Sequence, residues 1–276
     1  MSFAAAVAEP ATCARIVTLL YAFGLVIAFA EKLYRVRDYG EAGWFTWQIL
    51  GFDREHLGWF RRWKRLARSL FGARGMGLGF ALGITGALAL GFATPRTGAF
   101  TAAIAATLVG TLMCFARSNY GGDGAQQMNL IIGAGLLLGF NPWVSAEVGT
   151  ICLLSIAAHS CFAYFTSGVA KLVSPIWMRG DPLAAILATK AYGSPLGYKL
   201  VERAPRLRRP IGIAMVITEA AFPIALLGPW WLVLAFFAWG VLFHVANAVL
   251  MGLNSFLWAF VATYPAIAFV WTLLHH

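Results

Sequence analysis

The chain has 276 residues, of which 60% are hydrophobic and only 12% are charged. Soluble domains carry about 25% charged residues, so this composition excludes an ordinary soluble protein and predicts an integral membrane protein. The formal net charge is nevertheless +10. The four cysteines have no spacing typical of a metal site, and we expect them to be small buried apolar residues with no metal bound.

Eight apolar windows are long enough, or nearly long enough, to cross a bilayer as helices. No basic segment precedes the first window and no clear cleavage site follows it, so we expect a retained helix rather than a cleaved signal peptide. The pattern predicts an all-α fold, a polytopic bundle of about eight transmembrane helices with additional interfacial amphipathic helices, forming one transmembrane domain over residues 1–276. The windows, of which the fourth is the shortest, lie at 13–31, 75–93, 97–116, 127–142, 147–170, 210–228, 230–250 and 254–273.

The cations are concentrated in the loops between these windows. Segment 32–74 holds ten Lys or Arg, segment 171–209 holds eight, and Arg117 follows the third window. If all eight windows cross, these segments share one side of the membrane, and only Arg15 and Arg96 lie elsewhere. The positive-inside rule therefore predicts a multi-pass cell-membrane protein whose basic loops 32–74 and 171–209 are cytoplasmic, with both termini outside.

Within the first basic segment, Arg54–Phe71 has apolar residues at three- and four-residue steps with cations between them. This pattern is typical of a helix that lies in the interface and binds anionic lipid head groups. Nucleic acid is the rival partner for a basic run, but the flanking spans already account for the charge, so we expect lipid and no nucleic acid.

The second basic segment contains a stretch punctuated by proline and glycine, Val173–Tyr198. Within it, Asp181 precedes Pro182 and a short apolar run. An aspartate followed by proline is typical of a helix N-cap and first helical position. We therefore predict a short interfacial or re-entrant helix capped by Asp181.

Polar and ionisable side chains within spans are candidates for function, because burying them in lipid is costly. Glu219 lies near the middle of its span and must be protonated, paired or hydrated. The predicted topology places Lys171, His244 and Asn247 at a similar depth, together with Asp123 in the glycine-rich turn 119–124. The candidates within or at the ends of the spans are Glu31, Lys32, His159, Lys171, Glu219, His244, Asn247 and Asn254.

Two interpretations of these residues stay open at this point. Lys171 could extend its amine to the head groups, and His244 and Asn247 could form hydrogen bonds that only hold helices together. Alternatively, Lys171 faces protein, because Ser160, Tyr164 and Ser167 share its face of the helix.

Two segments resemble a known family. Tyr164-Phe-Thr-Ser-Gly-Val-Ala-Lys171-Leu172, followed by Trp177 and Gly180, is similar to the lysine-bearing segment of the vitamin K-dependent gamma-carboxylase. Phe243-His-Val-Ala-Asn247 resembles a later Phe-His-x-x-Asn helix of that enzyme. Together they resemble the horizontally transferred transmembrane domain family, whose bacterial members include maturation proteins for sporulation-delaying-type toxins.

The resemblance implies a quinone cofactor, similar to reduced vitamin K, that the amine of Lys171 deprotonates. Gly122-Asp123-Gly124 stands where the carboxylase has an Asn-His pair, and the sequence to residue 276 has no counterpart of the enzyme's large lumenal part. The implied catalytic residues are Lys171, His244 and Asp123. The implied ligand-binding residues are Tyr120, Tyr164, Trp177, Glu219, Asn247 and Asn254.

These observations support three hypotheses of function. The first is a carboxylase-like membrane enzyme that modifies or matures a small exported peptide with a quinone-type or other lipid-soluble ligand. The second is a non-catalytic subunit that scaffolds or anchors a larger membrane complex, with other membrane subunits as partners. A transporter is the least supported, because the sequence has no visible inverted repeat.

Overall fold

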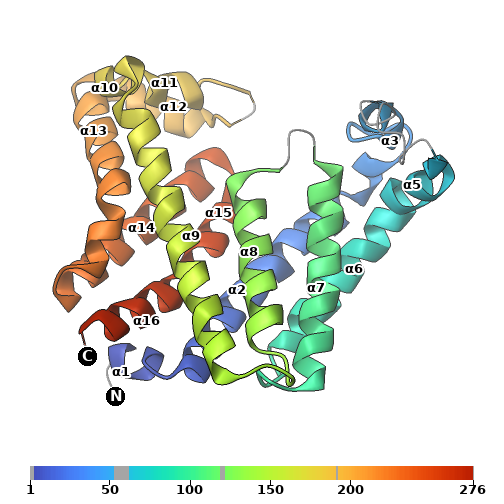
Figure 1. Cartoon of the computed structure of the whole chain (residues 1–276). Helices are drawn as coiled ribbons and strands as arrows, with labels where there is room; N and C mark the ends of the chain where they lie inside the picture. The colour runs from blue at the N-terminus through green and yellow to red at the C-terminus, as the bar shows by residue number, and fades with distance from the viewer. Residues whose placement is uncertain (1–2, 53–61, 119–121, 191, 276) are drawn as a thin grey trace. The chain divides into compact units, whose positions relative to one another are not determined.

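The computed structural model describes residues 3–52, 62–118, 122–190 and 192–275. Its regular elements are all helices, with no strand in these ranges, which confirms the predicted all-α class (Figure 1). Seven of the described helical segments are long and apolar enough to cross a membrane. The structure is therefore that expected of a multi-pass helical membrane protein.

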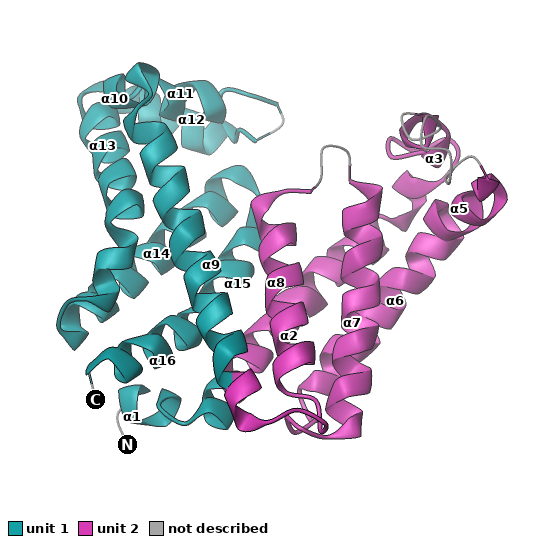
Figure 2. Ribbon diagram, in the orientation of Figure 1, with its two compact units in different colours: residues 1–13, 150–276 teal, residues 14–149 magenta. Residues whose placement is uncertain are grey.

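The chain divides into two compact units (Figure 2). Unit 1 comprises residues 1–13 and 150–276, and unit 2 comprises residues 14–149. Each unit contains several of the predicted spans, and the single transmembrane domain over 1–276 stays a prediction.

Unit 2 contains three of the long apolar helices and the shorter α8. Its fourth window, predicted at 127–142, forms a helix of only 16 residues, about 24 Å at 1.5 Å per residue. That length is short of the roughly 30 Å hydrocarbon core, which is why only seven segments meet the length of a span. The elements are most of α2 (Pro10–Tyr34), then η1 (Val36–Tyr39), α3 (Trp47–Leu50), α5 (Lys64–Phe71), α6 (Ala73–Leu90), α7 (Gly98–Arg117) and α8 (Gly124–Gly139).

The short α8 still returns the chain to the opposite end of unit 2. The Arg117 end of α7 leads into the turn before α8, while the residues after α8 lie against the α6–α7 loop. There, the Arg96 backbone amide donates to Phe140 O at 2.7 Å, and its guanidinium donates to Val144 O at 2.9 Å. Within unit 2, α8 therefore runs antiparallel to α7, as the predicted fourth crossing requires.

Arg15 and Arg96, the two cations outside the basic loops, are both bound to backbone carbonyls in unit 2. Arg15 donates to Leu90 O at 2.8 Å, to Ala93 O at 2.7 Å and to Gly91 O, where α6 ends. The last carbonyls of a helix have no partner within the helix, so a guanidinium satisfies them well. These two cations have a structural role at this end of the unit, which explains their separation from the basic loops.

Unit 1 contains four long apolar segments and a group of short helices between the first and second. The last segment is interrupted between Val261 and Tyr264, so the predicted window 254–273 forms two helices. The elements are α1 (Phe3–Val7), most of α9 (Ala146–Leu172), α10 (Pro175–Arg179), α11 (Asp181–Leu187), α12 (Pro195–Arg203), α13 (Pro205–Ala221) continued by η4 (Phe222–Leu226), α14 (Trp230–Met251), α15 (Asn254–Val261) and α16 (Tyr264–His275).

The predicted helix at Asp181 is present as α11, but the predicted cap is wrong by one residue. Gly180 precedes the helix with a φ of 84°, and no side chain caps it. Asp181 is the first helical residue and pairs with Arg179 at 3.3 Å. The left-handed backbone that only glycine adopts readily fixes the turn between α10 and α11, so the aspartate is not needed as a cap.

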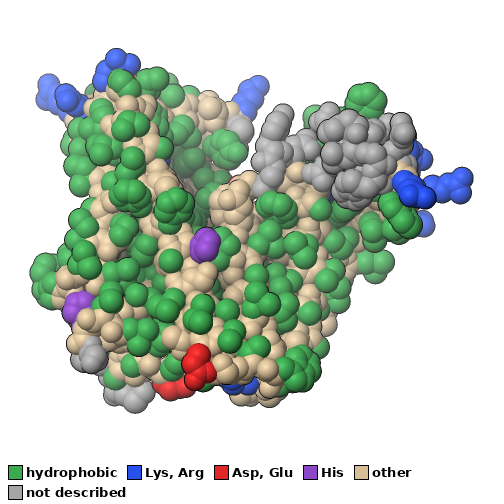
Figure 3. All heavy atoms as spheres, in the orientation of Figure 1, with side chains coloured by type: hydrophobic (Ala, Val, Ile, Leu, Met, Phe, Trp, Pro, Cys, Tyr) green, Lys and Arg blue, Asp and Glu red, His purple; other side chains and the backbone are tan. Residues whose placement is uncertain are grey.

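The predicted interfacial helix over Arg54–Phe71 is partly described, since residues 54–61 lie outside the described ranges. Its second half forms α5, where Leu66 and Leu70 are exposed beside Arg65 and Arg68. In the view of Figure 3, Lys and Arg gather over α5 in unit 2 and over the α10–α12 end of unit 1, whereas apolar side chains cover the long helices of both units.

Candidate functional site

Lys171, in the last turn of α9, is paired with a buried carboxylate. Its amine forms an ion pair with Glu219 of α13 and donates a hydrogen bond to Ser167 Oγ at 2.8 Å. The amine also lies 5.4 Å from the centre of the Trp177 ring, within cation–π range. The Glu219 side chain is 2% exposed and that of Lys171 is 20% exposed, so Lys171 faces protein.

A close approach between α9 and α13 makes this pair possible. A Cβ atom at Gly168 would collide with the backbone of Ala220, so only glycine permits this packing. The contact places Glu219 beside Ser167, whose hydroxyl lies 3.4 Å from Glu219 Oε2. Lys171 is one helical turn beyond Ser167 and therefore reaches the same carboxylate.

A second polar group, one turn earlier on α9, forms a chain of hydrogen bonds. Tyr164 Oη lies 2.7 Å from His244 Nε2 and 2.9 Å from Tyr264 Oη. All three residues are buried, and the Tyr164 ring stacks on Phe222 with 4.0 Å between the ring centres. His244 Nδ1 is buried and has no hydrogen-bond partner in the described structure. A buried nitrogen of this kind is costly unless a water or ligand satisfies it.

Two cavities meet at Lys171. The smaller, about 170 Å³, has a mixed lining, in which Glu219, His244 and Asn247 lie among apolar residues such as Phe256 and Phe260. The larger, about 600 Å³, is almost entirely apolar, with Trp177 among its walls. Lys171, Phe243, Asn247 and Leu253 line both. The site can therefore hold a molecule with an apolar body and one polar end, in the size range of ordinary ligand pockets.

Six of the predicted site residues lie together in unit 1: Lys171, His244, Tyr164, Trp177, Glu219 and Asn247. Asn254 begins α15 and lines neither cavity. Asp123 belongs to unit 2, where its side chain caps α8 by accepting from the Gln126 amide at 2.8 Å. Its part in the Lys171 site stays a prediction, and Tyr120 lies outside the described residues.

Sequence reasoning missed Tyr264, which follows the interruption in the last apolar segment. Thr263, in that interruption, is buried and lies 2.7 Å from Ser160 of α9 through their hydroxyl oxygens. The signal available was the Thr-Tyr-Pro sequence at 263–265, because proline favours the end or start of a helix rather than its interior. Gly168, which permits the approach of α13, was also missed.

The fold and the site together define a class: a polytopic helical membrane protein with a lysine–glutamate pair beside two cavities, a small one that contains polar groups and a larger, almost entirely apolar one. No group of three His, Cys, Asp or Glu that could hold a metal ion occurs among the residues that the structure describes. Comparisons with models of protein families, with curated proteins and with solved structures find no match for this chain.

Proposed function

We propose that this protein is a membrane enzyme that binds a quinone-type ligand in reduced form beside Lys171 and modifies a small exported peptide. The observation that supports such a ligand is the position of Lys171, which lines both a 600 Å³ apolar cavity and a smaller cavity that contains Glu219 and His244. The peptide substrate rests on the resemblance of the Lys171 and His244 segments to the carboxylase.

The residues present fit such a ligand. An apolar ring and side chain would occupy the larger cavity, and a ring oxygen would face Lys171 and Asn247, which border both cavities. His244 Nδ1, buried and without a partner in the described structure, supplies another polar contact. Tyr164, which is itself hydrogen-bonded to Tyr264, orients the imidazole through its other nitrogen.

A hydroquinone would supply an acidic phenolic O–H and two reducing equivalents. The Glu219 carboxylate is placed to accept the proton directly or through Ser167, with the electron pair of the broken O–H bond left on the ligand oxygen. Lys171 keeps its positive charge and stabilises the negative oxygen. Because the pair is largely removed from water, this electrostatic interaction is stronger than it would be in solvent.

The proposed orientation places the basic loops 32–74 and 171–209 in the cytoplasm. Arg15 and Arg96 are the two cations outside those loops and would count against this orientation. Both bind backbone carbonyls, so their position has a structural reason, and this supports the proposed orientation. A Lys199→Cys variant should resist a membrane-impermeant thiol reagent in intact cells and react after lysis. Labelling in intact cells, above that of the wild type with its four native cysteines, would contradict this orientation.

The ligand is tested with purified protein and a short-chain menaquinol under anaerobic conditions. The menaquinol should raise the melting temperature of the wild type and of the Lys199→Arg control in a concentration-dependent way. Lys171→Arg keeps the charge beside Glu219, so it should fold, but its larger planar group should weaken binding about tenfold. Equal stabilisation of Lys171→Arg and the control would contradict the assignment of the site.

The peptide is tested by co-expression with an exported peptide encoded beside the gene. Its mass should change with the wild type and the Lys199→Arg control, but not with Lys171→Arg. If the peptide is unchanged with every variant while menaquinol binds normally, the proposed peptide-modifying activity is contradicted and the proposed ligand site is not. The non-catalytic subunit stays a prediction, and copurification of stoichiometric membrane partners would favour it.

A further inference from the structure

The large apolar cavity of unit 1, about 600 Å³, has a second cation besides Lys171. Among its described lining residues, only Lys171 and Arg208 are charged. Lys171 is paired with Glu219, whereas Arg208, in the first turn of α13, forms no ion pair in the described structure. The ligand proposed above faces Lys171 and leaves Arg208 without a role.

The position of the Arg208 guanidinium follows from a proline. Arg208 Nε donates to Val201 O at 3.0 Å. In a continuous helix this carbonyl would accept from the amide four residues later, but that residue is Pro205, which has no N–H. The bond holds the guanidinium against Val201, which also lines the cavity, and its two terminal nitrogens have no hydrogen bond in the described structure.

The acids of the adjacent short helices have other partners. Glu202 of α12 accepts from Tyr198 Oη at 2.7 Å, and Asp181 of α11 pairs with Arg179. Neither acid forms an ion pair with Arg208, whose side chain is partly buried. A partly buried guanidinium with both terminal nitrogens free favours an oxyanion, which it can bind through two parallel hydrogen bonds.

The cavity extends from Arg208 along two helices. On α13, Arg208, Ile211 and Met215 line it at helical spacing, and the seven-residue step from the first to the last corresponds to a rise of about 10 Å. On α14, the lining residues run from Phe243 to Met251 over a similar length. An elongated apolar space with a cation near one end is complementary to a hydrocarbon chain with an anionic head.

We propose that this cavity binds a long-chain carboxylate, a fatty acid, with its head group at Arg208 and its chain along Ile211 and Met215. One carboxylate balances the single charge of Arg208, whereas a phosphate monoester would bring a second negative charge. Leu200 and Leu207, which line the cavity near Arg208, are apolar and offer no side-chain partner to a larger head group. This inference rests on Arg208 and does not require the proposed quinone-type ligand.

The bilayer is the expected source of the fatty acid. On α12, Leu196 and Leu200 are exposed beside the exposed Lys199, as in a helix that lies among lipid head groups. Leu200 also lines the cavity, so the cavity wall is continuous with this exposed apolar surface.

The test uses the purified full-length protein in phosphatidylcholine nanodiscs at mildly alkaline pH, where a fatty acid is charged. Dibromostearate is titrated, because bromine quenches tryptophan fluorescence on contact and Trp177 lines the cavity. The chain has eleven tryptophans, so each variant is made with and without Trp177→Phe, and the difference in quenching reports on the cavity. Methyl dibromostearate, with the same chain and no charge, is the ligand control.

We expect dibromostearate to give saturable, Trp177-dependent quenching and its methyl ester to bind at least tenfold more weakly. Arg208→Gln should weaken dibromostearate binding about tenfold, and Arg208→Lys, which keeps the charge without the planar fork, should weaken it less. Lys199→Gln, at an exposed position of α12 outside the cavity lining, should bind as the wild type does. The ester and Arg208→Lys keep the test valid if Arg208→Gln does not fold.

Equal binding by Arg208→Gln and Lys199→Gln, or equal binding of the acid and its ester, would overturn the proposal. Displacement of dibromostearate by oleoyl lysophosphatidylglycerol at a lower concentration than by oleate would also overturn it, because the preferred head group would then be a phosphodiester. Menaquinol should still raise the melting temperature of Arg208→Gln, which keeps Lys171 and Asn247. If menaquinol does not stabilise the wild type while Arg208-dependent quenching persists, the quinone-type ligand is contradicted and the fatty-acid site is supported.

Discussion

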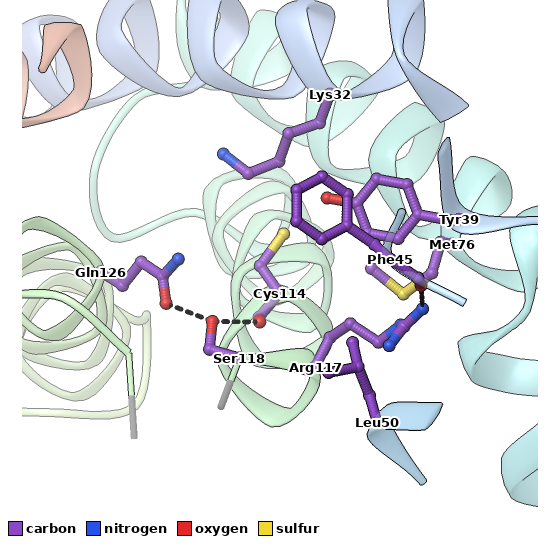
Figure 4. Close-up of a pocket in the computed structure, with 9 residues that line it drawn as sticks. All are labelled: Lys32, Tyr39, Phe45, Leu50, Met76, Cys114, Arg117, Ser118 and Gln126. Atoms are coloured by element: carbon purple, nitrogen blue, oxygen red, sulfur yellow. Dashed lines mark hydrogen bonds between the residues drawn. The ribbon is translucent and has the colours of Figure 1, made fainter. Parts of the chain in front are cut away.

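Lys171 in unit 1 and Lys32 in unit 2 both face cavities within an apolar chain, but they differ in their counter-charge. Lys171 is paired with the buried carboxylate of Glu219. The cavity at Lys32, of about 310 Å³, contains a second cation, Arg117, and no acid among its described lining residues (Figure 4). The first site therefore holds both charges of an ion pair, whereas the described lining of the second holds cations alone.

This difference explains why the two cavities suit different chemistry. A balanced ion pair beside a large apolar cavity can receive a neutral ligand and exchange a proton with it. Two cations on the described lining of the other cavity would repel a cationic ligand. The sign and pairing of the charges, more than the size of the cavity, therefore distinguish the two sites.

The substitution with the largest expected effect on stability removes the counter-charge of Lys171 in unit 1. Glu219→Gln should leave Lys171 unpaired and lower the free energy of unfolding by roughly 3 kcal/mol, because a buried ion pair has lost one partner. The measurement is thermal or denaturant unfolding of the purified protein in detergent. Glu202→Gln, on an exposed carboxylate of α12, should change stability little.

A double variant separates charge from packing. Lys171→Met with Glu219→Leu should recover most of the lost stability, because neither charge is then buried alone. If Glu219→Gln is as stable as Glu202→Gln, the pair does not contribute as proposed, and the contrast between the two units fails.

The second test addresses the helix contact that creates the pair. Gly168→Ala places a methyl group against the Ala220 backbone and should cost about 2 kcal/mol, the usual effect of overpacking. Gly98→Ala is the matched control, because no atom lies within 4 Å of a Cβ at that position. Equal melting temperatures for the two variants would show that α9 and α13 do not need this close contact.

The smallest expected effect concerns the hydrogen-bond chain at His244. Tyr264→Phe removes the hydroxyl that bonds to Tyr164, and it should lower stability by about 1 kcal/mol, since Tyr164 keeps its bond to His244. Tyr34→Phe, at a side chain that is 90% exposed, is the control. If Tyr264→Phe is as stable as this control, the Tyr264 hydroxyl does not stabilise the Tyr164–His244 hydrogen bonds.

The sequence by itself determined the helical class and the positions of the apolar segments. Hydropathy depends on the composition of each segment, and a segment in lipid can satisfy its backbone only as a helix. For this reason the predicted windows match the described helices, apart from the length of α8 and the interruption before Tyr264. The sequence also singled out Lys171, Glu219, His244 and Asn247, because polar groups are costly at membrane depth and therefore conspicuous.

Only the tertiary structure decided which of these groups meet. The Lys171–Glu219 pair depends on Gly168, which permits two helices to approach, and helix periodicity does not specify which helix packs against that face. The Tyr164–Tyr264 bond depends on the break at residues 262–263; Pro265 indicates a helix boundary there, but not which side chain the tyrosine then meets. The cavity at Lys32 likewise requires Tyr39 of η1 and Arg117, 78 residues apart, to come together through a cation–π contact that the sequence cannot display.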